Sequence, residues 1–188
     1  MSDTINTTKL RMLAVAGSLR QASLHRALLR SLQELAPSDV EIVMFDLKGM
    51  PIYDGDVEVQ GMPDIVQAFH QEIEAADGVI WATPEYNGAM SGVIKNAVDW
   101  ASRKKGLLAK KPTTVISGSP GSLGATKGQE SLRASLNHLG MYVLARPSLA
   151  IPQLDKKLRD DHIIDESTQK FVRDWLQSFQ DWIVQLNK

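Results

Sequence analysis

The residues best suited to chemistry in this chain stand in a short loop near its beginning, Gly17–Arg20, with Ser23 just after it. The loop separates an apolar run, Met12–Ala16, from a stretch with helical spacing, which is the order of a first strand, loop and helix in an α/β sheet. Such a loop presents unpaired backbone N–H groups and a positive helix end, which suit a phosphate. Serine hydroxyls and the forked guanidinium of Arg20 would add donors for phosphate oxygens. The stretch therefore predicts a phosphate pocket for a nucleotide; alternatively, Ser23 only caps the helix and Arg20 faces solvent.

Two further loops carry residues suited to a flat ligand. Pro84–Gly88 follows the apolar run Gly78–Thr83, and Ser119–Gly124 follows Thr113–Ser117. Proline fixes the chain direction, and glycine lets the backbone approach a planar ring closely. Parallel strands end at the same edge of a sheet, so the three loops are expected to line one crevice. The prolines and glycines could also simply mark turns.

The apolar pattern predicts the elements that would hold these loops. Strands are predicted at Met12–Ala16, Glu41–Phe45, Gly78–Thr83, Thr113–Ser117 and Met141–Leu144. Helices are predicted within Leu24–Leu35, Ile65–Ala76, Val93–Trp100, Gln129–Leu139 and Phe171–Leu186, with Lys48–Gly61 as a long loop. Strands that alternate with helices predict an α/β fold with a doubly wound parallel sheet and helices on both faces.

Length and composition limit the class of function. The chain has 188 residues, 43% of them hydrophobic, which predicts one domain over residues 1–188 with residues 1–8 as a flexible lead-in. A net charge of -1 gives no basic excess for nucleic acid. Cysteine is absent, so redox chemistry would need a bound cofactor. No apolar stretch is long enough to span a membrane and no secretory leader is evident, so a cytoplasmic location is expected.

Three motifs in combination resemble the NAD(P)H-dependent FMN reductase family. They are Gly17–Arg20 with Ser23, Thr83–Gly88 (TPEYNG) and Lys95–Trp100 (KNAVDW), and the likeness is closest to the bacterial quinone and chromate reductases. The resemblance implies a flavodoxin-like three-layer sandwich whose five-stranded parallel sheet has the order 2-1-3-4-5. It also implies a bound FMN, NADPH or NADH as the electron donor, and homodimers that can pair into tetramers.

Carried over residue by residue, the resemblance implies a cofactor site built from the three loops. Ser18, Arg20 and Ser23 would bind the FMN phosphate, with Leu19, Leu24 and His25 beside them. Pro84, Glu85, Tyr86 and Asn87 would border the isoalloxazine ring, largely through backbone groups, and Ser119 and Gly121 would approach it from the third loop. No catalytic side chain and no metal is expected, since the flavin would carry the redox chemistry. His25 departs from the family, which often has Asn there, and Gly124-Ala125 stands where a Gly-Gly pair is common.

The implied function is two-electron transfer from NAD(P)H through FMN to quinones, flavins or other small acceptors such as chromate or azo compounds. Backbone N–H groups of Tyr86–Gly88 would stabilise negative charge on the reduced flavin. The alternative is a flavodoxin-like one-electron carrier, although such carriers tend to be strongly acidic and to use a neutral phosphate loop. A Rossmann dinucleotide site fits less well, because the first turn lacks the G-x-G-x-x-G series, and the Gly-Lys-Ser/Thr that a P-loop needs is absent.

The sequence leaves open the role of one side chain and the position of the subunit contacts. Glu85 is an acid–base candidate; alternatively, its side chain pairs with a neighbouring subunit or solvent while its backbone serves the flavin. The loop around Tyr53-Asp54 and exposed parts of the Trp100 helix are candidate dimer contacts.

Overall fold

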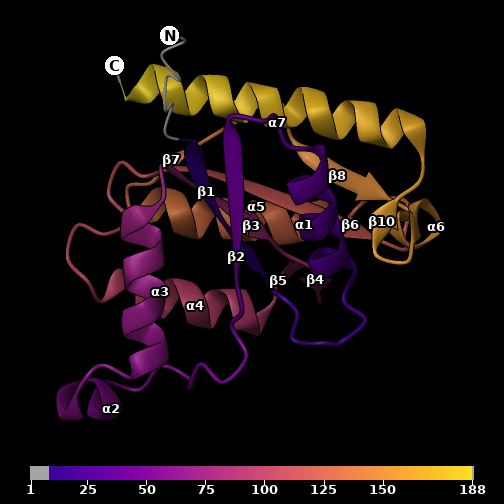
Figure 1. Cartoon of the computed structure of the whole chain (residues 1–188). Helices are drawn as coiled ribbons and strands as arrows, with labels where there is room; N and C mark the ends of the chain where they lie inside the picture. Colours follow the sequence, from indigo (N-terminus) through magenta and orange to yellow (C-terminus); the bar gives the residue numbers. More distant parts are fainter. Residues whose placement is uncertain (1–8, 188) are drawn as a thin grey trace, which may run out of the picture.

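The computed structural model describes residues 9–187, so the predicted lead-in, residues 1–8, lies outside the described residues. Its main sheet is parallel, with β2 (Val40–Phe45), β1 (Leu10–Ala16), β3 (Gly78–Ala82) and β6 (Pro112–Ser119) in this order. The position beyond β6 is shared by β7 (Tyr142–Val143), at the start of β6, and β8 (Leu149–Pro152), at its end (Figure 1). The predicted order 2-1-3-4-5 is thus confirmed, with its fifth position divided between two short strands.

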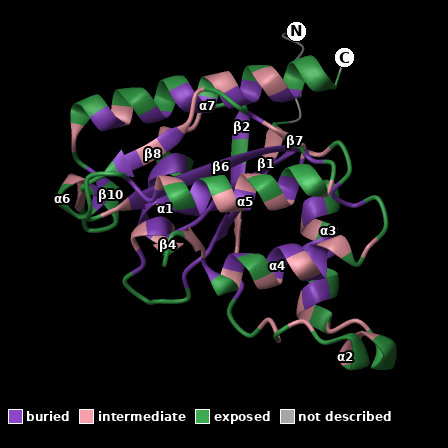
Figure 2. Cartoon of the chain, turned by 180° about the vertical axis from the view of Figure 1, so that it is seen from behind, coloured by how far each residue is buried: buried purple, intermediate pink, exposed green. Residues whose placement is uncertain are grey.

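Helices cover both faces of this sheet. On one face lie α1 (Leu24–Leu35) and α7 (Glu166–Leu186). On the other lie α3 (Asp64–Ala75), α4 (Gly92–Ser102) and α5 (Thr126–His138). Figure 2 shows the buried stripes of these helices turned toward the sheet and their exposed stripes turned outward.

Strand β1 shows why the core has two halves. Successive side chains of a strand point to opposite faces. Met12 and Ala14 accordingly pack with α1 and α7, while Leu13 and Val15 pack with the helices of the other face. All four side chains are completely buried, which is the pattern of a strand covered on both sides.

Several short elements lie where loops were predicted. The loop Lys48–Gly61 contains α2 (Gly55–Gln60), which begins at the Asp54 cap and ends at Gly61. The loop after β3 folds into a hairpin of β4 (Glu85–Tyr86) and β5 (Ala89–Met90). Between β8 and α7 lie α6 (Leu154–Lys157) and a hairpin of β9 (Leu158–Arg159) and β10 (His162–Ile163). Elements of two to six residues carry too little periodicity to be predicted from sequence.

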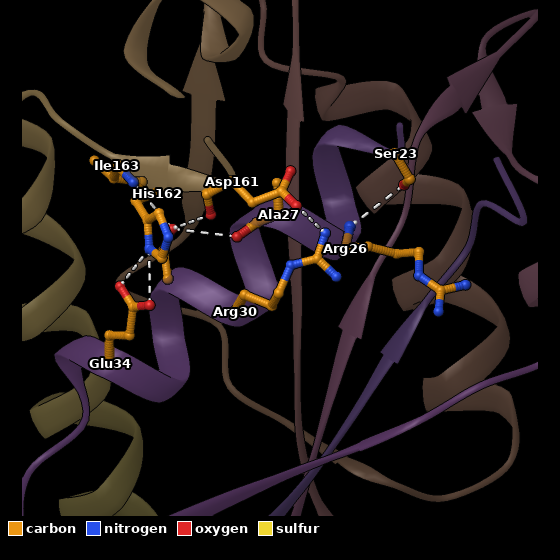
Figure 3. Close-up of polar contacts among 9 residues, drawn as sticks. Ser23, Arg26, Ala27, Arg30, Glu34, Asp161, His162 and Ile163 are labelled. Atoms are coloured by element: carbon orange, nitrogen blue, oxygen red, sulfur yellow. Dashed lines mark hydrogen bonds and ion pairs between the residues drawn. The ribbon is translucent and has the colours of Figure 1, made fainter. Parts of the chain in front are cut away.

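The β9–β10 hairpin is held by polar contacts to α1 (Figure 3). Arg30 pairs with Asp161 at 2.5 Å, and Glu34 Oε1 lies 2.7 Å from His162 Nδ1. Ser31 Oγ accepts a hydrogen bond from the Ile163 backbone N–H at 3.1 Å. These contacts fix the connection between α6 and α7 against the helix whose first turn faces the site described below.

No helix within residues 9–187 has both the length and the apolar character needed to cross a membrane.

Candidate functional site

A cavity of about 330 Å³ opens where the loops after β1, β3 and β6 meet, at the carboxyl edge of the sheet. This volume lies in the usual range for small-molecule sites. The predicted residues that line it are Ser18, Arg20, Ser23, Leu24, His25, Pro84, Glu85, Tyr86 and Ser119. Leu19 instead lines a smaller neighbouring cavity with Met50 and Ile52, while Asn87 and Gly121 line neither.

The end of the cavity at α1 is rich in donors. Ser18 and Ser23 are buried, and Ser23 Oγ accepts a hydrogen bond from the Arg26 backbone N–H at 3.3 Å as the cap of α1. Arg20 is exposed at the cavity and has no ion-pair partner among residues 9–187. The first turn of α1 contains no acidic residue that would oppose an anion. Helix end, hydroxyls and free guanidinium together can hold a phosphate group.

The surroundings of the His25 side chain indicate whether a ligand fits this cavity. Its side chain is 5% exposed, and its Nε2 has no hydrogen-bond partner within the described part of the chain. Burial lowers the pKa of the ring to about 4, against a smaller opposing effect of a hydrogen bond with the Thr83 backbone. The ring is therefore neutral near pH 7. Buried polar atoms nearly always have a partner, so an unpartnered nitrogen on a residue that lines the cavity is consistent with a ligand there that carries a hydrogen-bonding group, as FMN does.

Gly17 and Ser91 hold the first loop against the second. A side chain at Gly17 would begin 2.3 Å from Ile94 Cγ1 and 2.8 Å from Ser91 Oγ, so only glycine fits there. Ser91 Oγ donates to the Gly17 carbonyl at 2.7 Å and accepts from the Ile94 N–H at 3.2 Å as the cap of α4. The start of the predicted phosphate-binding loop, at Gly17, is thus hydrogen-bonded to Ser91, which directly follows the β4–β5 hairpin.

The β4–β5 hairpin forms the second wall of the cavity. Its turn passes through Asn87 at φ 53° and Gly88 at φ 77°, and Tyr86 is 51% exposed. Glu85 Oε2 accepts a hydrogen bond at 3.0 Å from the backbone N–H of Lys127, in the first turn of α5. The residue before α5, Ala125, offers no side-chain cap, so Glu85 supplies one. This contact within the same chain was not among the predicted uses of the Glu85 side chain.

Four further residues line the cavity, namely Ala22, Gly118, Pro120 and Asp155. Pro120 lies inside the predicted third loop, Ala22 stands just before Ser23, and Gly118 directly precedes Ser119. Asp155 comes from α6, far along the chain, and no local pattern marks it.

A parallel sheet of this order, with a donor-rich loop after its first strand and a cavity at its carboxyl edge, defines the flavodoxin-like class of α/β proteins. Residues 10–156 match the family described as NADPH-dependent FMN reductase. The chain is 35% identical to an NAD(P)H-dependent FMN reductase of Pseudomonas aeruginosa, over 99% of each chain. It is 34% identical to the 2-hydroxy-1,4-benzoquinone reductase of a Burkholderia species, over 93% of this chain and 96% of that one.

Solved structures agree with this result. FerB, a flavoenzyme NAD(P)H:(acceptor) oxidoreductase from Paracoccus denitrificans, superposes with a TM-score of 0.86 at 35% identity, over 93% of this chain and 97% of that one. A flavodoxin from Pseudomonas aeruginosa shares the fold at a TM-score of 0.58 and 15% identity, over 95% of this chain and 99% of that one. The chain belongs to the NADPH-dependent FMN reductase family. It is accordingly an oxidoreductase with FMN as cofactor and NAD(P)H as donor.

Proposed function

We propose that this enzyme passes two electrons from NADPH or NADH to quinones, free flavins or other small acceptors such as chromate or azo compounds, by way of FMN held in the 330 Å³ cavity. When bound, FMN supplies the redox chemistry by accepting a hydride at N5 and passing the electrons on. The observation that carries this proposal is the cavity itself. One end is rich in hydrogen-bond donors that suit a phosphate group, and another wall is formed by the β4–β5 hairpin.

The chain's own residues would bind and orient the cofactor. Ser18, Arg20, Ser23 and the first N–H groups of α1 would bind the phosphate, with Leu19 and Leu24 beside them. Neutral His25 would donate or accept one hydrogen bond through its free Nε2. Pro84, Glu85 and Tyr86 would border the ring through their backbone, and Ser119 would close the third side. Asn87 and Gly121, which do not line the cavity, would approach the ring only from its edge. Holding both reactants in register is the main contribution of such a site to the rate.

A direct test is the visible spectrum of the purified protein and its change on mixing with NADPH in the absence of oxygen. The protein should be yellow, NADPH should bleach the flavin absorbance, and a quinone added afterwards should restore it. Flavin that binds but is not bleached by NADPH or NADH would contradict the proposal and favour the one-electron carrier. A colourless protein that refuses added FMN would remove the cofactor site altogether.

Replacing Arg20 with Ala should weaken FMN binding about 10- to 100-fold, because a charge-assisted hydrogen bond contributes roughly 1.5–3 kcal/mol. Quenching of flavin fluorescence on titration gives the dissociation constant. Arg173→Ala is the matched control, since it removes the same charge from the exposed face of α7. Equal affinities in the two variants would remove Arg20 from the site.

Assembly as a homodimer, or as a tetramer of two dimers, is part of the proposal. The segment before and within α2 projects from the body of the protein (Figure 1), and it exposes Ile52 by 78% and Val59 by 88%. It is nevertheless firmly held: the Tyr53 N–H donates to Asn96 Oδ1 and Trp100 Nε1 donates to the Pro51 carbonyl, each at 2.8 Å. An ordered projection with exposed apolar side chains suits contact with a second copy of the chain.

Charged substitutions should separate the copies. Ile52→Glu with Val59→Glu is expected to convert the oligomer to monomers in light scattering, because carboxylates would be buried in an apolar contact. The control pair Ile164→Glu and Val184→Glu changes apolar residues with 45% and 42% exposure elsewhere and should leave the mass unchanged. An oligomer that survives the first pair excludes α2 from the interface.

A cytoplasmic location also remains part of the proposal, to be tested by cell fractionation.

A further inference from the structure

The β4–β5 hairpin does not stand alone at the cavity but rests on α5, and no residue of α5 lines the cavity. At the start of the hairpin, Glu85 Oε2 accepts from the Lys127 N–H at 3.0 Å. At its end, the Met90 N–H donates to Ser131 Oγ at 2.6 Å. Both ends of the hairpin are therefore fixed to one helix.

Gly128 sets how closely the helix and the hairpin approach each other. A Cβ atom at this position would lie 2.7 Å from the Pro84 carbonyl oxygen and 3.2 Å from the Glu85 Cα. These are backbone atoms, which cannot rotate away as the end of a side chain can. Any larger residue at position 128 must therefore push the hairpin and α5 apart.

Ser131 completes the connection. Its hydroxyl is half-buried, accepts from the Met90 N–H, and donates to the Gly128 carbonyl at 3.1 Å. One side chain thus joins the hairpin to the helix turn that packs against it. Loss of this hydroxyl would leave the Met90 N–H without its acceptor in a partly buried place.

We propose that Ser131 and Gly128 are positioning residues for flavin chemistry. They fix the distance between the β4–β5 hairpin and α5, and so place the backbone N–H groups of the hairpin beside the isoalloxazine ring. Neither residue touches the cavity, and both act through the hairpin. The inference rests on the proposed function, since it takes FMN to lie against Tyr86–Gly88. If these N–H donors are displaced by a fraction of an ångström, they stabilise less well the negative charge that develops when the ring is reduced.

The test compares Ser131→Ala with Ser135→Ala. Ser135 lies one turn further along α5, is also half-buried, and donates only within the helix, to the Ser131 carbonyl at 3.3 Å. Flavin-free protein is examined by amide hydrogen exchange of residues 85–91. FMN-loaded protein is examined for the reduction potential, the visible circular dichroism of the flavin, and the rate of bleaching by NADPH.

Ser131→Ala should speed amide exchange in the hairpin, lower the reduction potential of the flavin and slow its bleaching by NADPH about tenfold or more. Ser135→Ala should match the wild type in all three measurements. Ser131→Thr keeps the hydroxyl and should restore most of the wild-type behaviour. Gly128→Ala should also slow bleaching, although alanine is the better helix former. Because its intrinsic effect on helix stability is favourable, a slower rate in this variant would point to the displaced hairpin.

Two failures are distinguishable. If the wild type binds FMN and is bleached, but Ser131→Ala matches Ser135→Ala in exchange, potential and rate, the positioning role is overturned and the proposed function stands. If the wild type binds no FMN, the proposed function fails and the positioning role fails with it, whatever the exchange data give.

Discussion

Replacing Gly17 with Ala should cost the protein about tenfold or more in FMN affinity and roughly 1–3 kcal/mol of stability. The added methyl group would overlap Ile94 Cγ1 at 2.3 Å and crowd Ser91 Oγ at 2.8 Å and Pro84 Cδ at 3.0 Å. Relief requires the chain to move at the residue just before Ser18, which is where the phosphate loop begins. Titration with FMN and thermal unfolding of the flavin-free protein measure the two effects.

Gly92→Ala is the control for this substitution. Gly92 begins α4 on the other side of Ser91, and a Cβ atom there would meet nothing within 4 Å. The control should keep both FMN affinity and stability. A Gly17 variant that behaves like the Gly92 variant would show that the first loop can shift without loss, and that the crowding described here does not limit the site.

The second large effect concerns acid. Flavin-free protein should lose about 3 kcal/mol of stability between pH 6.5 and pH 4 through His25 alone. Burial lowers the pKa of the folded-state ring to about 4, whereas the unfolded ring titrates near its ordinary value of 6.5. In this window the unfolded chain binds the proton and the folded chain does not, so acidification favours unfolding. Above pH 6.5 the contribution is complete and no longer varies with pH.

Denaturant unfolding at several pH values measures this effect, with His25→Asn as the variant that cannot titrate. The variant should show a flatter dependence over the same window, even if its stability at pH 7 is lower. His138→Gln, which removes an exposed histidine of α5, is the comparison variant. Equal slopes for wild type and His25→Asn would mean that the buried ring accepts a proton without cost, for instance by turning Nε2 to water.

Much of the fold could be predicted because its main signals are local. The runs that form β1 and β3 are mostly apolar, as is usual for strands buried on both faces. The run that forms β6 is marked instead by four consecutive β-branched residues, 113–116, followed by a loop rich in Gly, Ser and Pro. The three loops follow these runs directly, so their meeting at one edge follows from parallel pairing. The helix α1 repeats leucine at helical spacing and is capped by Ser23, and both features can be read from the sequence.

The parts that escaped prediction depend on partners far along the chain. The β9–β10 hairpin is fixed by contacts such as Arg30 with Asp161, which lie 131 positions apart. Glu85 finds its partner 42 positions away, at the backbone of α5. Asp155 reaches the cavity only because α6 is folded back over the end of β6. A residue's use in such places is decided by tertiary packing, which short stretches of sequence do not encode.

The divided strand position beyond β6 has a consequence for behaviour at high concentration. An outermost strand with a long row of free peptide groups invites another molecule to add its own strand, and so leads to aggregates. Here the row is broken between β7 and β8, and the Arg133 guanidinium occupies the break, donating to the Leu144 carbonyl at 2.6 Å and the Val115 carbonyl at 3.3 Å. This margin of the molecule therefore offers no continuous template for intermolecular β-pairing.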